Sequence, residues 1–250
     1  MTTTVAIIGA RGRMGRLVSE VVDGLDGFEV VARIGSADSL EGMLAADVVV
    51  DVTVPAVSQS VVDFAVDRGK PVLVGTSGWS NQRITALTRR VAAQPGLGVI
   101  VIPNFSLGSV LATSFAATAA RFFDSIEIIE AHHASKVDSP SGTAVRTAEL
   151  IGAARASLGP VIAPHADQRA RGQQVSSVPI HSLRMEGVVA KQDVIFGGTG
   201  EILTVSHETL SPTSYVAGIR LALQALPQTE GVVVGLDKLI ELDAGSSDPS

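Results

Sequence analysis

The chain of 250 residues contains no cysteine, and aromatic residues make up only 4% of it. The missing cysteine excludes a disulfide framework, a thiolate nucleophile and any cysteine-ligated zinc or iron–sulfur site. Basic residues are also in the minority, with 19 Lys and Arg against 25 Asp and Glu, and the formal net charge is -6. We therefore expect no nucleic acid and no anionic membrane as a partner, because both favour an excess of basic residues.

Charge is absent altogether from Val91 to Ala120, a stretch long enough to cross a bilayer. Pro95, Gly96 and Pro103 interrupt this stretch, and for that reason we expect a strand, a loop and a helix instead of a membrane span. The chain starts with Met-Thr-Thr-Thr and no basic leader, which favours a cytoplasmic protein.

Aliphatic residues and glycine are abundant, with 46% of the chain hydrophobic and 25 Gly. In the first hundred residues, short apolar runs alternate with segments of helical spacing. The runs lie at 4–8, 28–32, 48–52, 72–74 and 98–102. Continuous apolar strands separated by helices are typical of a parallel sheet that is covered on both faces. The expected fold class is therefore α/β, with a Rossmann-like, doubly wound parallel sheet.

The pattern changes after Phe105. We expect helices at 107–123 and 140–156, the second capped by Ser139 with Pro140 at its first position. A polar loop is expected at 158–174, and strands at 125–131, 178–185, 192–196 and 201–206. Strands in close succession predict an α+β region with a mixed or antiparallel sheet.

The end of the chain returns to the first pattern, with a helix around 215–226 and an apolar run at 231–234. We therefore predict two domains, one formed by residues 1–106 and 215–250 and the other by residues 107–214. Residues 244–250 are expected to form a frayed tail.

A glycine-rich loop follows the first apolar run. Gly9, Gly12 and Gly15 are spaced by three, with Ala10, Arg11, Arg13 and Met14 between them. Glycine permits a tight turn and lets the backbone approach a pyrophosphate, which then binds the free N–H groups of a helix start. The spacing differs from the commoner Gly-x-Gly-x-x-Gly, and an ordinary strand-to-helix turn is the alternative. The context of strand, loop and helix favours dinucleotide binding.

The second apolar run ends in Arg33, and its only acidic residue, Glu29, lies at the wrong end to hold the ribose hydroxyls of NAD. Arg11 and Arg13 stand in the glycine loop nearby. Arginines without a carboxylate suit a 2′-phosphate, which predicts NADPH as the preferred cofactor, with NADH possible but weaker. The alternative is that Arg33 is an exposed strand-end charge.

Two later loops fall at the ends of expected parallel strands, where a dinucleotide is bound in such folds. They contain Gly75, Thr76 and Ser77 in the first, and Ile102, Pro103, Asn104 and Phe105 in the second. Their position predicts contacts with the nicotinamide half of the cofactor.

A second cluster of reactive side chains contains His132, His133 and Lys136, ahead of the Ser-Gly-Thr sequence that ends at Thr143. Histidine exchanges protons near neutral pH, lysine is a positive charge, and a helix start offers N–H donors to an anion. The cluster predicts proton transfer to a carboxylate-bearing substrate; a polar loop that merely caps a helix is the alternative. We expect no metal site, because no ligand pattern such as His-Glu-x-x-His occurs.

Together, the glycine loop 9–16 and the segment Glu130-Ala-His-His-x-x-Lys-x-Asp-x-Pro-Ser-Gly-Thr-Ala144 closely resemble the 4-hydroxy-tetrahydrodipicolinate reductase (dihydrodipicolinate reductase) family. The resemblance covers essentially the whole chain. It implies a reductase of the diaminopimelate route to lysine, with a nucleotide-binding domain made from both chain ends. It also implies a central domain that binds a dicarboxylate substrate and assembles a homotetramer.

The resemblance also implies roles for individual residues. His132 would be the general acid that protonates the ring carbon next to the site of hydride addition, and Lys136 would supply a second proton or a positive charge. His133, Gly142 and Thr143 would hold a substrate carboxylate. Ser135 departs from the histidine that many members carry there, and Arg33 departs from the acidic residue of members that use NADH well.

Other classes are less compatible with the sequence. A short-chain dehydrogenase needs Tyr-x-x-x-Lys, but the only tyrosine, Tyr215, is followed by Ile219 at that spacing. A covalent thiohemiacetal mechanism is excluded by the absence of cysteine. A non-catalytic NADP(H)-sensing homologue and a reductase of another cyclic imine dicarboxylate stay open.

Overall fold

The structure, a computed structural model, describes residues 1–240, so the tail expected at 244–250 lies outside the described residues. The chain divides into two compact units. The first consists of Met1–Leu107 with the chain from Tyr215 onward, and the second of Gly108–Ser214.

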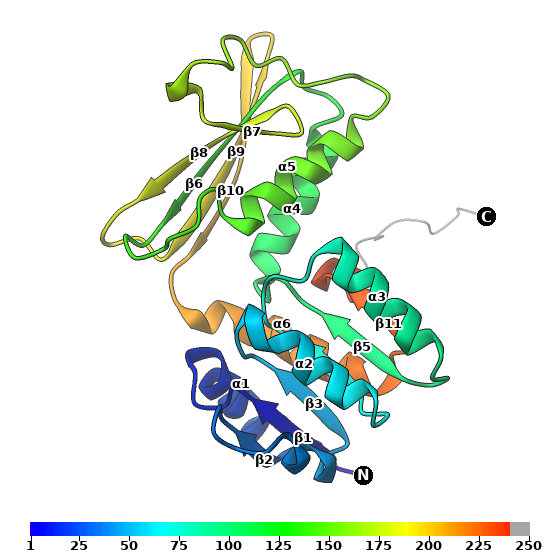
Figure 1. The fold of residues 1–250 in the computed structure, drawn as a ribbon. Coiled ribbons are helices and arrows are strands. Elements are labelled where there is room, and N and C mark those ends of the chain that lie inside the picture. The colour runs from blue at the N-terminus through cyan, green and yellow to red at the C-terminus, as the bar shows by residue number, and fades with distance from the viewer. Residues whose placement is uncertain (241–250) are drawn as a thin grey trace, which may run out of the picture. The chain divides into compact units, whose positions relative to one another are not determined.

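The first unit is built on a six-stranded sheet in the order β11-β5-β4-β3-β1-β2, in which every pairing is parallel (Figure 1). Its strands are β1 (Thr3–Ile8), β2 (Phe28–Ile34), β3 (Val48–Asp51), β4 (Val72–Val74), β5 (Gly98–Val101) and β11 (Gly231–Val234). Its helices are α1 (Arg13–Asp23), α2 (Pro55–Val66), α3 (Asn81–Ala92) and α6 (Val216–Ala225). The α/β fold class is confirmed, and β11 brings the end of the described chain back to this sheet.

The central strands β3, β4 and β5 are buried on both faces of the sheet, which explains their continuous apolar runs. On one face, Val49, Val74 and Val99 pack with α2 and α3, whose buried residues include Val62 and Leu87. The residues that alternate with these along the strands are equally buried: Val5, Ile7, Val50, Leu73 and Ile100. Burial of both sets removes apolar surface from water on the two sides of one sheet, the main stabilisation of such a fold.

The uncharged stretch from Val91 to Ala120 contains the end of α3, all of β5 and α4 (Leu107–Ala119). None of the helices within residues 1–240 combines the length and the apolar character needed to cross a membrane.

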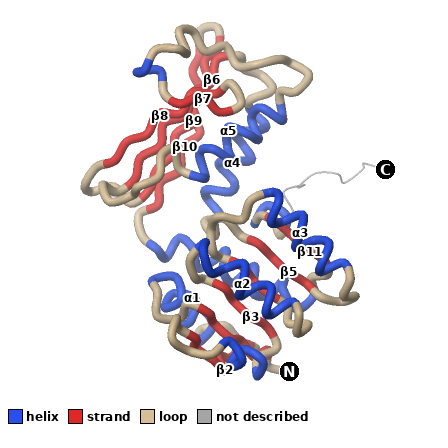
Figure 2. The backbone as a smooth tube through the Cα atoms, viewed as in Figure 1, coloured by secondary structure: helices blue, strands red, loops and turns tan. Residues whose placement is uncertain are grey.

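The second unit contains a five-stranded mixed sheet in the order β10-β9-β6-β8-β7 (Figure 2). Its strands are β6 (Ser125–His132), β7 (Gln173–Val175), β8 (Val178–Arg184), β9 (Ala190–Gly198) and β10 (Glu201–Thr209). Strands β6 and β8 pair in parallel, and the other pairings are antiparallel. One face packs on helices α4 and α5 (Gly142–Ala154), with Ile128, Ile151 and Phe196 in its core.

Two details of the second unit were predicted wrongly. The helix expected from Pro140 begins at Gly142, and its cap is Ser141, whose Oγ accepts a hydrogen bond from the N–H of Ala144 at 3.2 Å. Ser139 and Pro140 instead form a cis peptide ahead of the cap. Strand β7 begins at Gln173, inside the loop expected at 158–174, because pairing with β8 orders a polar edge strand that has no apolar signal of its own.

Candidate functional site

The glycine loop joins β1 to α1 at the carboxyl end of the sheet. Gly9 has a φ of +86°, and a Cβ there would lie 2.5 Å from the carbonyl oxygen of Val52. Gly15 packs directly on this turn. Gly12 caps α1 without any side-chain hydrogen bond, and the first turn of α1 holds no acidic residue. The start of α1 therefore offers backbone N–H donors and a positive dipole end to an anion, so the loop fits a dinucleotide pyrophosphate.

We expect Gly15→Ala to disrupt this loop and Gly12→Ala to preserve it. A Cβ at Gly15 would lie 2.2 Å from the carbonyl oxygen of Gly9 and 2.6 Å from Ala10 Cα, whereas at Gly12 the nearest atom lies 3.3 Å away. Chemical denaturation should show about 3 kcal/mol lost from the free energy of unfolding in Gly15→Ala, and less than about 1 kcal/mol in Gly12→Ala. Equal losses of unfolding free energy in the two variants would contradict the close packing of Gly15 on Gly9 and Ala10.

The cofactor prediction assumed arginines without a carboxylate, and for Arg11 and Arg33 this premise was wrong. Arg11 Nη2 lies 3.2 Å from Oδ2 of Asp38, and the same oxygen accepts the N–H of Gly35 at 2.8 Å. Arg33 Nη2 lies 3.2 Å from Oδ2 of Asp23, the last residue of α1. The glycine loop lies at the other end of α1, so the structure does not bring the Arg33 guanidinium to the loop.

Gly35 follows β2 and lies beneath the side chain of Arg11. A Cβ at Gly35 would lie 3.1 Å from Arg11 Nε and 3.3 Å from Cδ and Cζ. The Arg11 side chain therefore occupies the space that a side chain at this position would need. Arg13, in the same loop, is exposed.

The loops after β3, β4 and β5 meet at the same edge of the sheet. A Cβ at Gly75 would lie 2.7 Å from Phe105 Cε2 and 3.0 Å from Val52 Cγ1, so these three residues pack together. Thr76 is buried, and its Oγ1 donates to the backbone carbonyl of Asp51 at 3.4 Å. The predicted loops are thus brought beside Gly9, which also packs on Val52.

Exposure differs among the predicted residues of these loops. Ile102 and Phe105 are buried, so only their backbone could reach a ligand, whereas Ser77 and Pro103 are exposed. The Oδ1 of Asn104 accepts the N–H of Ser106 at 2.9 Å, which holds the second loop in shape.

Sequence reasoning assigned no role to Asp51, which is fully buried at the end of β3. Its carboxylate accepts the hydroxyl and the N–H of Thr53, at 2.6 and 3.1 Å, and the hydroxyl of Ser58. Trp79 Nε1 in turn donates to Ser58 Oγ at 2.9 Å. The network links the loop after β3 to the segment that follows the Gly75 loop.

In the second unit, His132 ends β6 and its ring contacts a buried carboxylate. Nδ1 lies 2.5 Å from Oε2 of Glu130, whose side chain is 0% exposed. Arg184 on β8 forms a two-pronged contact with the same carboxylate, at 2.9 Å from Nη1 and 2.8 Å from Nη2. The N–H of Ser141 donates to Oε1 at 3.2 Å, so the cluster joins β6, β8 and the start of α5.

Burial and charge shift both acid–base groups of this cluster. Burial lowers the pKa of His132, Glu130 partly opposes this by favouring the charged ring, and the positive charges of Lys136 and Arg184 lower the pKa further. Burial alone would raise the pKa of Glu130, but hydrogen bonds from Arg184, Ser182 and His132 hold it below its usual range. Glu130 is therefore an ionised acceptor near neutral pH.

The loop after β6 carries the other predicted side chains. His133 Nδ1 lies 2.8 Å from Ser135 Oγ, so Ser135 contacts the His133 ring. Lys136 Nζ donates to both carboxylate oxygens of Asp138 at 2.7 Å, and the ammonium group holds the pKa of Asp138 below its usual value. Asp138 is a partner of Lys136 that the sequence did not suggest.

Gly142 and Thr143 form the first turn of α5, directly after its cap. No atom lies within 4 Å of a Cβ built on Gly142, so the backbone is open to an approaching group there. The Thr143 carbonyl accepts the hydroxyl of Thr147 at 2.9 Å. The helix start thus combines an open backbone with the positive end of a helix dipole.

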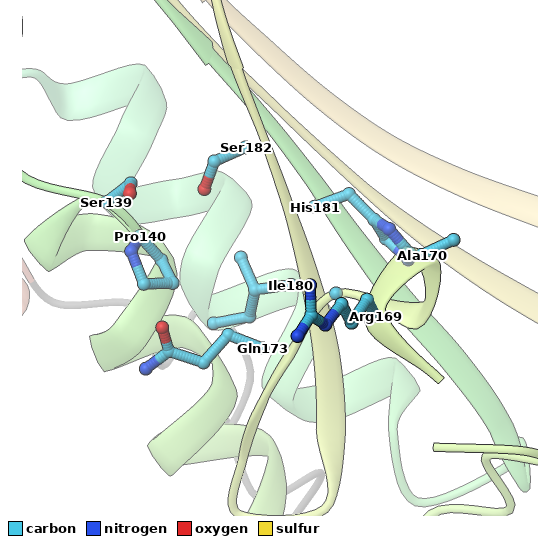
Figure 3. A pocket seen from close by; sticks show the side chains of 9 residues that line it. Ser139, Pro140, Arg169, Ala170, Gln173, Ile180, His181 and Ser182 are labelled. Atoms are coloured by element: carbon cyan, nitrogen blue, oxygen red, sulfur yellow. The ribbon is translucent and has the colours of Figure 1, made fainter. Parts of the chain in front are cut away.

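A pocket of about 460 Å³ lies beside this segment in the second unit (Figure 3). Its walls come from the Ser139–Pro140 peptide, the turn at Arg169 and strand β8. None of the predicted substrate residues lines it. Within residues 1–240, no group of three or more His, Cys, Asp or Glu side chains is arranged to hold a metal ion.

Sequence reasoning assigned no role to three residues of this cluster: Glu130, Arg184 and Asp138. The sequence does carry a signal for Glu130: it shares a strand face with Ile126 and Ile128, which pack in the core, and a carboxylate on such a face needs a partner. Arg184 carries no such signal, because only the pairing of β8 with β6 brings it to Glu130.

Comparisons with known proteins cover almost the whole chain. Residues 3–105 match the family model described as "Dihydrodipicolinate reductase, N-terminus", and residues 108–240 match the one described as "Dihydrodipicolinate reductase, C-terminus". The 4-hydroxy-tetrahydrodipicolinate reductase of Clavibacter michiganensis subsp. michiganensis is 66% identical over 243 residues, 97% of this chain and 88% of that protein. The Streptomyces griseus enzyme of the same name is 42% identical, over 96% of this chain and 98% of its own.

Solved structures agree with this. Dipicolinate-bound dihydrodipicolinate reductase from Paenisporosarcina sp. TG-14 superposes with a TM-score of 0.81 at 29% identity, covering 96% of this chain and 100% of that one. A scyllo-inositol dehydrogenase from Lactobacillus casei, at 11% identity and a TM-score of 0.60, covers 95% of this chain and 92% of its own and shares the fold alone.

Proposed function

This chain belongs to the dihydrodipicolinate reductase family, and from that premise we propose that it reduces 4-hydroxy-tetrahydrodipicolinate to tetrahydrodipicolinate, with NADPH as the preferred electron donor. It is an oxidoreductase of lysine and diaminopimelate biosynthesis with a nicotinamide cofactor. In the reaction the substrate gains a hydride and a proton and loses water. The observation that carries the proposal is the cluster of a proton donor, an ammonium group and an open helix start in one segment of the second unit.

His132 is the proposed general acid. Its ring is held at Nδ1 by Glu130, which leaves Nε2 to meet the substrate. The protonated imidazole of His132 can transfer its proton to the carbon of the substrate ring next to the one that receives the hydride. Burial lowers the pKa of His132, and only the protonated ring can act as the acid. The rate should therefore begin to fall with rising pH at a pH below the pKa of an ordinary histidine.

Besides the protonated His132, Lys136 is proposed to supply a positive charge or a second proton. Its ammonium group is paired with Asp138, an exposed residue, so a substrate carboxylate can take over one of the two contacts. His133 and the N–H groups of Gly142 and Thr143 are proposed to bind the same carboxylate at the positive end of α5. This part of the site orients the dicarboxylate.

The dinucleotide, when bound, supplies the hydride. We propose that the glycine loop binds its pyrophosphate and that the loops after β4 and β5 contact the nicotinamide half. The residues proposed for these contacts are Gly9, Ala10, Arg11, Gly12, Arg13, Met14, Gly75, Thr76, Ser77, Ile102, Pro103, Asn104 and Phe105.

The proposed preference for NADPH rests on Arg11, Arg13 and Gly35. Gly35 follows β2 with Arg11 across it. The carboxylate at this place, Asp38, is held by the Gly35 N–H and by Arg11 itself. Arginine forms two-pronged contacts with phosphate, so Arg11 and Arg13 are proposed to bind the 2′-phosphate. Arg33 takes no part in this proposal, because its pairing with Asp23 places its guanidinium at the end of α1 that lies away from the glycine loop. NADH remains a weaker donor in this account.

We also propose that the protein is a homotetramer. The face of the second sheet opposite α4 and α5 carries partly or fully exposed apolar side chains, among them Ile129, Leu183 and Ile202. An open apolar sheet face of this kind suits contact with another copy. The mass of the purified protein in solution should be four times 25.7 kDa, and a monomer mass would contradict the proposal. A cytoplasmic location stays a prediction.

The proposed function is tested by following NADPH oxidation with substrate generated enzymatically in the same vessel. We expect oxidation that depends on the substrate and is slower with NADH. Cofactor binding without any oxidation would favour the NADP(H)-sensing homologue. Oxidation only with a different cyclic imine dicarboxylate would show that the protein is a reductase of that other substrate.

A further inference from the structure

Glu130 is a fully buried carboxylate whose two oxygens are both engaged. Its neighbours on the same face of β6 are Ile126 and Ile128, which belong to the core. Burying a charge costs several kcal/mol unless it is paired and hydrogen-bonded. Here the compensation comes from the Arg184 guanidinium, the Ser182 side chain, the Ser141 N–H and the ring of His132. An isolated structural ion pair would not need the last of these.

The contact between Glu130 and His132 determines where the ring carries its proton. An ionised carboxylate only accepts hydrogen bonds, so the ring nitrogen 2.5 Å from Oε2 carries the hydrogen. The neutral ring of His132 is therefore protonated at Nδ1, and Nε2 holds the free electron pair. When the ring gains a second proton, that proton is on Nε2, the nitrogen away from Glu130.

Arg184 connects this arrangement to the rest of the site. Besides Glu130, its Nη2 donates to the backbone carbonyl of Asp138 at 2.7 Å, in the loop that carries Lys136. Glu130 Oε1 accepts the N–H of Ser141, the cap of α5. One buried ion pair thus contacts the proton donor, the Lys136 loop and the helix start that is proposed to bind the substrate carboxylate.

We infer that Glu130, held by Arg184, is the positioning residue of the reaction: it keeps the proton of the resting ring on Nδ1, directs Nε2 to the substrate, and fixes His132 relative to Lys136 and the start of α5. The inference rests on the proposed function for the identity of the reaction. Its basis in geometry, the contacts of one buried carboxylate with His132 on β6, with β8 and with the start of α5, does not.

The charged groups acting on His132 are Glu130 on its own strand, Arg184 on β8 and Lys136 in the following loop. The residue opposite on β9 is Ala190, which carries no charge. Glu130 favours the charged ring, and the two cations disfavour it. Removing the carboxylate should therefore lower the pKa of His132, while removing the Arg184 charge should raise it.

The test is the nitrogen NMR signal of the His132 ring, followed across pH in the free protein. In the unsubstituted protein we expect the neutral ring to be protonated at Nδ1. Glu130→Gln should abolish this preference and move the titration to lower pH, and Arg184→Gln should move it to higher pH. A general loosening of the fold would move both variants in one direction, so opposite shifts identify the carboxylate and the cation as separate influences.

Glu127 on the same strand offers a matched control. It also contacts one arginine and one histidine, Arg171 and His181, but it takes no part in the proposed site. Glu127→Gln should leave the His132 signal and the pH profile of turnover unchanged. In Glu130→Gln we expect kcat to fall roughly 10²-fold and its decline with rising pH to start earlier.

The inference and the proposed function fail on different results. Unchanged His132 tautomer and titration in both Glu130→Gln and Arg184→Gln would overturn the inference, whatever the substrate. Absence of substrate-dependent oxidation by the unsubstituted protein would overturn the proposed function. If Glu130→Gln does not fold, the direction of the shift in Arg184→Gln decides: an upward shift supports the inference, and no shift or a downward shift overturns it.

Discussion

His132→Gln is expected to lower kcat by roughly 10²–10⁴-fold while the affinity for NADPH stays unchanged. Glutamine keeps a polar side chain of similar length but cannot become an acid near neutral pH. The loss follows from the proposed mechanism, in which His132 protonates the ring carbon of the substrate next to the one that receives the hydride. Cofactor affinity should not change, because the glycine loop and its arginines lie in the first unit and His132 in the second.

Steady-state kinetics together with a direct NADPH titration measures both effects. His165→Asn is the matched control: His165 is exposed in a loop of the same unit, and asparagine tolerates its φ of 56°. Turnover of His165→Asn should equal that of the unsubstituted protein. Unimpaired turnover in His132→Gln would remove His132 as the acid, and loss of NADPH binding would show that the substitution acts elsewhere.

Gly35→Asp is expected to reverse the cofactor preference. The new Cβ would lie 3.1 Å from Arg11 Nε, so the Arg11 side chain must shift to make room for it. The carboxylate would then repel a 2′-phosphate and accept the ribose hydroxyls of NADH. One charge-assisted hydrogen bond contributes about 1.5–3 kcal/mol. The ratio of kcat/KM for NADPH over NADH should therefore fall by roughly 10–100-fold.

Two further variants separate the contributions of the arginines. Arg11→Ala should lower the same ratio without improving the use of NADH, because it removes a phosphate donor and adds no ribose acceptor. Arg33→Asp should leave the ratio unchanged, since the structure pairs Arg33 with Asp23. If the ratio changes in Arg33→Asp and not in Gly35→Asp, Arg33 and not Arg11 binds the 2′-phosphate.

Periodicity was sufficient to predict the parallel sheet. Runs such as 48–50 and Val72–Val74 are buried on both faces, so every residue in them is apolar. The start of α5 was harder to place. Proline is common at the first helical position, and this favoured Pro140, but the free hydroxyl that reaches the Ala144 N–H belongs to Ser141.

Ion-pair partners were the least predictable part of the site. Arg33 reaches Asp23 from a neighbouring element, and Arg184 reaches Glu130 from β8, 54 positions along the chain. Such pairs depend on strand order and register, which no local pattern in the sequence contains. A role for the His132 segment could be proposed from the sequence because its residues are adjacent, but Glu130, the carboxylate that contacts the ring, could not be assigned a role without the fold.

The most direct test of the proposed reduction uses NADPH deuterated at the transferred position, with enzymatically generated 4-hydroxy-tetrahydrodipicolinate. Mass spectrometry of the product should show one deuterium from the cofactor and the loss of water from the substrate, in the unsubstituted protein and, far more slowly, in His132→Gln. A product without cofactor-derived deuterium, or oxidation of NADPH that does not depend on this substrate, would contradict the account.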